Sequence, residues 1–192
     1  MPVTIRAAHP DDLEALAALA ARTFPMAAPD DAAPDGVAAF IASVLSADAF
    51  AGYLADPARI VLVAETADDV ETPDDGETVD GEPNLIGYTM LIHGVPTDPD
   101  VVAAVATRPT IDLNKFYVDL DHHGSGVATT LMDAAIVAAR DAGMASVWLG
   151  VNDENRRAIR FYRKAGFEQV GTKWFRLGER DEHDYVMERR LT

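Results

Sequence analysis

Residues 116–132, FYVDLDHHGSGVATTLM, decide the fold of this chain. The alternating residues just before and into this stretch, 110–119, predict a strand that runs into a glycine-containing turn. A long helix is then expected from about 126 to 142, ending at Gly143. Glycines let the backbone turn sharply and let a ligand approach its amides, while the helix directs its unpaired N–H groups into the same space. The stretch predicts either a phosphate-binding turn or an ordinary tight turn.

Two common phosphate-binding patterns fit this turn poorly. A nucleotide-hydrolysing P-loop needs a lysine after its glycines, and none follows Gly126. The dinucleotide fingerprint is half met by Gly124 and Gly126, but Thr129 occupies the place of the third glycine. No acidic residue ends the next predicted strand, 146–151, to hold a ribose. If the turn binds a phosphate group, we therefore expect a ligand other than a hydrolysed nucleotide or a dinucleotide.

The remaining segments alternate between strand and helix patterns. Strands are expected at 3–6, 60–65, 85–93 and 146–151, with a closing hairpin of 167–177 and 183–191 around Gly178. Helices are expected from Pro10, over 37–54 and 98–107, and from a cap at Asn152 or Asp153 to Ala165. This order predicts an α/β (α+β) fold with a mixed sheet, and 192 residues suit a single domain, 1–192.

Composition narrows the possible functions. The chain has no cysteine, which excludes a cysteine nucleophile and a Cys-type zinc site. Its net charge of −16 disfavours nucleic acid and anionic membranes as partners. Residues 66–82 hold eight acids and no Lys or Arg, and we expect a solvated, flexible loop there. With no signal peptide and no membrane-spanning run, a soluble, cytoplasmic protein is expected.

Two sequence blocks resemble the Gcn5-related N-acetyltransferase (GNAT) family. His123-Gly-Ser-Gly-Val-Ala128 is similar to the family pattern [RQ]-x-x-G-x-[GA], with His123 in place of the usual Arg or Gln. The second block, Asn155–Phe167, lies at the expected distance. The ending, 170–178 followed by 184–188, looks like that of the PaiA-type spermidine/spermine acetyltransferases. The resemblance covers essentially the whole chain.

The resemblance implies a GNAT-like domain with a mostly antiparallel sheet, flanking helices and a splayed central strand pair. It implies acetyl-CoA as cosubstrate and no metal. The pyrophosphate would bind the loop, the pantetheine would pair with the strand edge, and an N–H near Val118 would stabilise the oxyanion. The cofactor-binding residues implied are Phe116, Tyr117, Val118, His123, Gly124, Ser125, Gly126, Val127, Ala128, Thr129 and Asn155.

The same resemblance implies catalytic residues. Tyr162 matches the tyrosine that protonates the departing thiolate, although its spacing also suits helix packing. Asp112 lies four residues before Phe116, where several members place a base, and a period of two puts both on one strand face with Asn114. Glu65 and ordered water are the alternative bases. Asn155 would bind the pantetheine arm or cap its helix.

The leading hypothesis is therefore acetyl transfer from acetyl-CoA to a small primary amine, a polyamine first, without a covalent enzyme intermediate. One alternative is a protein N-terminal or lysine acetyltransferase, and another is a catalytically silent CoA-binding module. The histidines at 93, 122 and 123 have no metal-binding spacing, so no metal is expected. The oligomeric state stays open, with a homodimer as one option.

Overall fold

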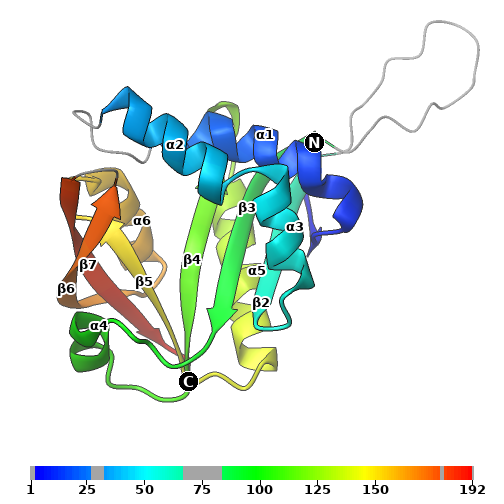
Figure 1. The fold of residues 1–192 in the computed structure, drawn as a ribbon. Coiled ribbons are helices and arrows are strands. Elements are labelled where there is room, and N and C mark those ends of the chain that lie inside the picture. Colours follow the sequence, from blue (N-terminus) through cyan, green and yellow to red (C-terminus); the bar gives the residue numbers. More distant parts are fainter. Residues whose placement is uncertain (1–2, 27–32, 67–83, 178–179, 192) are drawn as a thin grey trace, which may run out of the picture.

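A computed structural model describes residues 3–26, 33–66, 84–177 and 180–191. Its centre is a seven-stranded sheet with the strand order β1-β2-β3-β4-β5-β7-β6 (Figure 1). The strands are β1 (Val3–Ala7), β2 (Arg59–Thr66), β3 (Asn84–His93), β4 (Thr110–Val118), β5 (Ser146–Asn152), β6 (Glu168–Leu177) and β7 (Arg180–Arg190). Among the strands of the described ranges only β4 and β5 pair in parallel, so the predicted mixed, mostly antiparallel sheet is confirmed.

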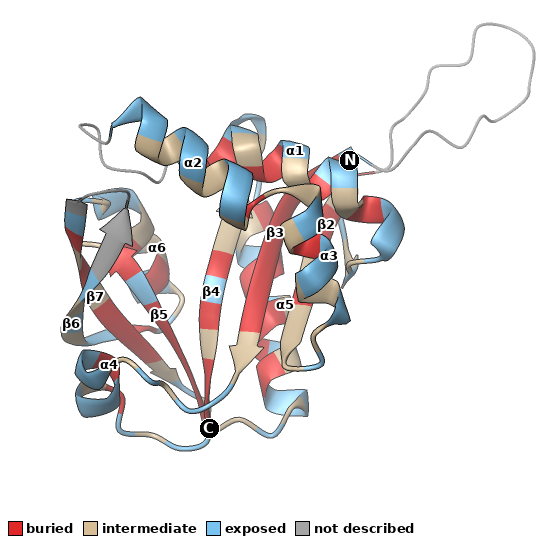
Figure 2. Cartoon of the chain, viewed as in Figure 1, coloured by how far each residue is buried: buried red, intermediate tan, exposed pale blue. Residues whose placement is uncertain are grey.

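Helices cover both faces of this sheet. They are α1 (Leu13–Thr23), α2 (Pro34–Val44), α3 (Ala47–Ala55), α4 (Pro99–Ala104), α5 (Val127–Asp141) and α6 (Arg156–Lys164). The first three pack over one face of β3 and β4 and bury a cluster around Phe50 and Tyr88. On the other face, α5 and α6 bury a cluster around Ile111, Met132 and Val147. Burial is concentrated where the helices meet the strands, as Figure 2 shows.

Two helix boundaries differ from the sequence expectation. The stretch 37–54 forms two helices, because Ser46 accepts a hydrogen bond from Ala49 N and starts α3 as an N-cap. The cap of α6 is Asn155, while Asn152 accepts from Glu154 N in the preceding turn. Gly143 adopts the expected left-handed conformation, φ +74°. The acidic segment beyond Thr66 and the turn at Gly178 lie outside the described residues.

The parallel pair of strands separates after a short ladder. β4 and β5 share only three partner pairs, Thr110–Ser146, Ile111–Val147 and Asp112–Trp148. Beyond them β5 continues beside β7, whereas β4 continues beside β3 (Figure 1). The edge of β4 that faces β5 is thereby left open from residue 113 onward. This is the splayed strand pair that the sequence predicts.

Within the described ranges, no single helix is long and apolar enough to cross a membrane. The helices α2 and α3 pass that test only as a pair, by length and composition, with a bend of 42° between them.

Candidate active site

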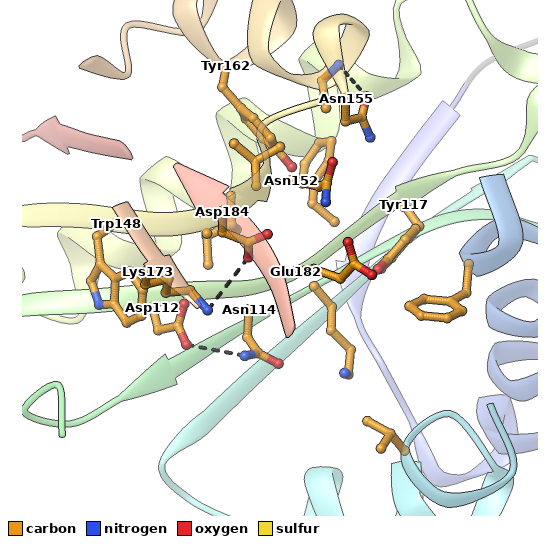
Figure 3. Close-up of a pocket in the computed structure, with 18 of the residues that line it drawn as sticks. Asp112, Asn114, Tyr117, Trp148, Asn152, Asn155, Tyr162, Lys173, Glu182 and Asp184 are labelled. Atoms are coloured by element: carbon orange, nitrogen blue, oxygen red, sulfur yellow. Dashed lines mark hydrogen bonds and ion pairs between the residues drawn. The ribbon is translucent and has the colours of Figure 1, made fainter. Parts of the chain in front are cut away.

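A cavity of about 380 Å³ occupies the gap between β4 and β5. It lies between the α1–α2 side of the molecule, represented by Phe24 and Phe40, and the α6 side, represented by Tyr162. Its polar lining residues are Asp112, Asn114, Lys115, Tyr117, Asn152, Asn155, Tyr162, Lys173, Glu182 and Asp184, of which Figure 3 labels all but Lys115. Polar groups that converge on a partly apolar cavity are typical of a small-molecule site.

A β-bulge in β4 decides which side chains share a face of the sheet. Lys115 pairs with Met90 and Leu113 with Leu91, so Asn114 is an extra residue without a partner on β3. Because Phe116 lies beyond this bulge, it packs with Phe161 on the α6 side, at 5.5 Å between ring centroids. The prediction that Phe116 shares a face with Asp112 is therefore wrong.

The open edge of β4 directs backbone groups into the gap. Asp119 N donates to Ile86 O of β3 over 2.8 Å. Since N–H directions alternate along a strand, the N–H of Val118 points the other way, into the gap that β5 has left. An extended ligand could add to this edge as a further strand. The expected roles of Phe116 and Val118 rest on this open edge.

The glycine turn has the conformation that an anion-binding loop needs. Gly124 and Gly126 have φ of +85° and +94°, and a Cβ on either would meet no atom within 4 Å. Gly126 is the N-cap of α5, and Val127 and Ala128 form its first turn, whose amides have no intrahelical acceptor. The turn thus has open space and free donors, which fit a pyrophosphate.

His123 closes this turn against the strand. Its Nε2 lies 3.0 Å from Val118 O and donates to it, so the imidazole holds the turn to the end of β4. Ser125 Oγ donates to His122 O over 2.6 Å and tightens the same turn. None of the residues from 118 to 129 lines the cavity, whereas Phe116, Tyr117, Asn155, Tyr162 and Asp112 do. The predicted residues therefore divide between the turn and the cavity.

Tyr162 belongs to both the core and the cavity. It is 9% exposed and packs edge-on against Phe116 and Phe167, with ring centroids at 6.3 and 5.8 Å. Figure 3 shows it reaching from α6 into the cavity. Burial raises the pKa of its phenol, with a smaller contribution from Tyr117. The phenol is therefore protonated at neutral pH, as a proton donor must be.

Asp112 is the last residue of β4 that is paired with β5. Its Oδ2 accepts a hydrogen bond of 3.2 Å from Asn114 Nδ2 (Figure 3). Burial raises the pKa of Asp112 to about 6, against the opposite effects of the Asn114 hydrogen bond and of Lys173 and Lys115. A carboxylate with this pKa is ionised at neutral pH and holds a proton more readily than an ordinary aspartate.

Asn155 acts as a helix cap, which was one of its two predicted roles. Its Oδ1 accepts from Ala158 N over 3.0 Å at the start of α6. The residue also lines the cavity. Its Nδ2 donates to no described residue, so the amide is free to bind a ligand.

Glu65, the alternative base, lies outside the cavity lining and is paired with an arginine. Its Oε2 is 2.7 Å from Arg6 Nη2, and Arg6 also bonds Asp12. All three belong to the β1 side of the sheet, outside the cavity lining. The alternating pattern of β2 predicts which face of the sheet Glu65 lies on. Its ion pair with Arg6 follows only from the pairing of β1 with β2.

Sequence reasoning missed a group of charged residues in the cavity. Lys173 on β6 lies 3.6 Å from Asp184 on β7, and Glu182 is two residues before Asp184. Lys115 on β4 also belongs to this group, and the uncharged Trp148 and Asn152 on β5 line the cavity beside it. The alternating pattern of β7 marks Glu182 and Asp184 as one face, but only the sheet order turns that face toward β4. Among the described residues no cluster of three or more metal-ligand side chains occurs.

Comparison with known proteins agrees with this geometry. The family model described as Acetyltransferase (GNAT) family matches residues 47–167, and the chain belongs to this family. An uncharacterized N-acetyltransferase of Mycobacterium tuberculosis is 42% identical over 180 residues, which cover 94% of this chain and 98% of that protein. The protein is therefore an acetyltransferase of the GNAT type.

Solved structures with low sequence identity share the fold. The PaiA N-acetyltransferase of Thermoplasma acidophilum in complex with coenzyme A has a TM-score of 0.73 at 19% identity, with both chains fully covered. The ribosomal-protein-S18-alanine N-acetyltransferase of Escherichia coli has a TM-score of 0.63 at 18% identity, covering 100% of this chain and 95% of that one. The shared fold therefore does not distinguish a small acceptor from a protein acceptor.

Proposed function

We propose that this protein transfers the acetyl group of acetyl-CoA to the primary amine of a small molecule by direct attack. The observation that carries the proposal is the cavity in the β4–β5 gap, which joins an open strand edge to a half-buried carboxylate and a buried phenol. Acetyl-CoA supplies the activated acyl group. The chain has no cysteine, in keeping with a reaction without a thioester on the enzyme.

In this proposal the turn and the strand edge hold the cosubstrate. The amides from Gly124 to Ala128 bind the pyrophosphate, as the left-handed glycines and the helix N-terminus favour. Strand β4 binds the pantetheine arm along residues 116–118, and the Nδ2 group of Asn155 donates to it. The N–H of Val118 stabilises the developing oxyanion.

Two side chains handle the protons. Asp112 accepts the proton of the attacking amine, directly or through a water molecule, and its hydrogen bond to Asn114 orients it. Tyr162 donates a proton to the departing thiolate. Its burial against Phe116 and Phe167 fixes the ring, and its raised pKa keeps the proton in place until the thiolate forms.

The charges of the cavity partly favour and partly oppose a polyamine as the acceptor. The carboxylates of Asp112, Glu182 and Asp184 line the cavity and would attract a polycation. The PaiA structural neighbour is consistent with the same idea. Lys115, however, places a buried cation in the same cavity. We therefore propose a small primary amine as the acceptor and include polyamines among the candidates to be tested. Cytoplasmic location and the absence of a metal stay predictions from the sequence.

Release of free thiol from acetyl-CoA with a panel of amines tests the proposal. The panel contains spermidine, neutral monoamines, amino acids and a peptide with a free N-terminus. Turnover of a small amine is the expected result. Turnover of the peptide alone would favour a protein acceptor. Tight CoA binding in calorimetry without any turnover would favour a catalytically silent module.

A further inference from the structure

Lys115 is a cation buried in the cavity wall. The residue is 7% exposed, and its side chain lines the cavity. Its Nζ lies 5.9 Å from the ring centroid of Phe40 and 5.6 Å from that of Tyr53. Among the described residues, no carboxylate forms an ion pair with this ammonium and no side chain accepts a hydrogen bond from it. The charge is therefore stabilised by the two aromatic faces and by the attraction of the Asp112 carboxylate, without a direct ion pair.

Aromatic faces compensate only part of the cost of burying an ammonium group. A cation–π contact contributes about 0.5–2 kcal/mol, whereas an unpaired buried charge costs several kcal/mol. The nearby guanidinium of Arg59 adds repulsion, and its own partner is Asp56 at 3.0 Å. Burial accordingly lowers the pKa of Lys115 to about 8. An anion in the cavity would relieve this cost.

Lys115 and Asp112 face the same way. They pair with Met90 and Ile92, which are two residues apart on β3 and so share a face of the sheet. The bulge at Asn114 makes this possible, because without it residues 112 and 115 would point to opposite faces. The Cα atoms of residues two apart on a strand face are roughly 7 Å apart, and Lys115 and Asp112 are neighbours of this kind. An amine held at Asp112 has its substituent close to Lys115.

Apart from Asp112, which shares β4 with Lys115, the charged residues of the cavity lie on two opposite sides. Glu182 and Asp184 belong to β7, and Asp184 is paired with Lys173 of β6. Lys115 lies across the gap on β4, beside the helices that carry Phe40 and Tyr53. A molecule with an amine at one end and an anion at the other can satisfy both sides, whereas a polycation places a charge against Lys115.

We propose that Lys115 binds a carboxylate of the acceptor, so that the acceptor is an amine that also bears a carboxylate, such as an amino acid. This inference rests on the proposed function and specifies its substrate class. The amine end lies toward Asp112 and the carboxylate end toward Lys115. Lys115 is thus a specificity-determining residue that takes no part in proton transfer.

The test compares amino acids with their carboxamides, which have the same shape and lack the charge. We measure kcat/KM for both members of each pair with the wild type, Lys115→Met, Lys115→Arg and the control Lys164→Met. Lys164 is an exposed residue at the end of α6. The acid and the amide differ in the basicity of their amines, but this difference cancels when the acid-to-amide ratio is compared between variants.

We expect the wild-type ratio to fall at least tenfold in Lys115→Met, about 1.4 kcal/mol. Lys115→Arg should retain much of the ratio, and Lys164→Met all of it, with unchanged acetyl-CoA affinity throughout. An unchanged ratio in Lys115→Met would overturn the inference while leaving the proposed function intact. Faster turnover of spermidine than of every amino acid would also overturn it.

A binding measurement keeps the inference testable without turnover. N-acetylglycine and N-acetylglycinamide are titrated into the CoA-bound protein by calorimetry. The acid should bind at least tenfold more tightly than the amide, and Lys115→Met should remove the difference. Equal binding of the two compounds to the wild type would reject a carboxylate site. Absence of turnover on all amines would reject only the proposed function.

Discussion

Asn114 donates a hydrogen bond of 3.2 Å to Asp112 from the bulged position of β4. The bulge has two consequences for the site. It orients the carboxylate that ends the β4–β5 ladder, and it reverses the alternation so that Lys115 joins Asp112 on one face. Phe116 moves to the opposite face and packs beside Tyr162. The bulge thus places Asp112, the proposed proton acceptor, on one face of β4 and Phe116, which packs against the proposed proton donor Tyr162, on the other.

Gly126→Val should weaken acetyl-CoA binding at least tenfold, about 1.4 kcal/mol. The side chain would occupy the open space in front of the turn, and φ of +94° is strained for a β-branched residue. Gly143→Val is the matched control, because it imposes similar strain at φ +74° far from the turn. Calorimetry measures the affinity and thermal melting measures the strain. Equal affinities in the two variants would contradict a role for the turn.

Tyr162→Phe should lower kcat roughly 10²-fold and leave acetyl-CoA affinity unchanged. The ring and its packing against Phe116 and Phe167 are kept, and only the hydroxyl is lost. Steady-state kinetics and calorimetry separate the two effects. Tyr117→Phe is the comparison, since Tyr117 on β4 is a second phenol that lines the cavity and also has a raised pKa. A large loss only in the Tyr117 variant would reassign the proton donor.

Asp112→Asn should abolish most activity and stabilise the fold at neutral pH. The pKa of Asp112 is about 6 in the folded protein, above the 3.8 of a free aspartate. Between these values the folded state binds more protons, so stability falls as pH rises through this window, by about 3 kcal/mol in all. The variant should lose this dependence. Urea unfolding of both proteins at pH 4 and pH 7.5 measures how the free energy of unfolding changes with pH.

The pH–rate profile gives a second readout for Asp112. Activity of the wild type should rise with an inflection near pH 6 as the carboxylate ionises. Equal kcat/KM for the wild type and Asp112→Asn over the whole pH range would assign proton removal to water.

Lys115→Met should raise Tm at pH 7, by roughly 2–4 °C for each kcal/mol gained. The pKa of Lys115 is about 8 in the folded protein, below the usual 10.5, because burial disfavours the charge. Between these values the unfolded chain binds more protons, so wild-type stability rises with pH from about 8 to 10. The variant should lack this rise. A destabilised variant would show that the ammonium supports the fold.

The turn could be predicted from the sequence because its determinants are local. Gly124, Gly126 and the helix that begins at Val127 are neighbours in the chain, and the conformation they need is encoded by residues without a Cβ. The strands β2 and β3 and the helix α5 follow their hydrophobic periodicity, and their bounds agree with the predicted ranges within a few residues.

Features that depend on pairing could not be predicted in this way. A bulge is defined by the opposite strand, so the face of Phe116 follows from β3 and was wrongly predicted from β4 alone. Glu65 is an alternative base by its place at the end of the predicted strand 60–65, and that pattern cannot show its partner Arg6, which lies 59 residues away on β1. The break between α2 and α3 arises where Ser46 caps a new helix inside a continuous apolar pattern.

The sequence by itself determined the family, the order of elements and the conformation of the glycine turn, because each depends on residues close together in the chain. Only the tertiary structure decided the composition of the cavity. The placement of β7 beside β5 brings Glu182 and Asp184 opposite β4, and the bulge turns Lys115 toward them. Burial then gives Lys115 and Asp112 their shifted pKa values, since the cost of a charge depends on the surroundings that distant segments create.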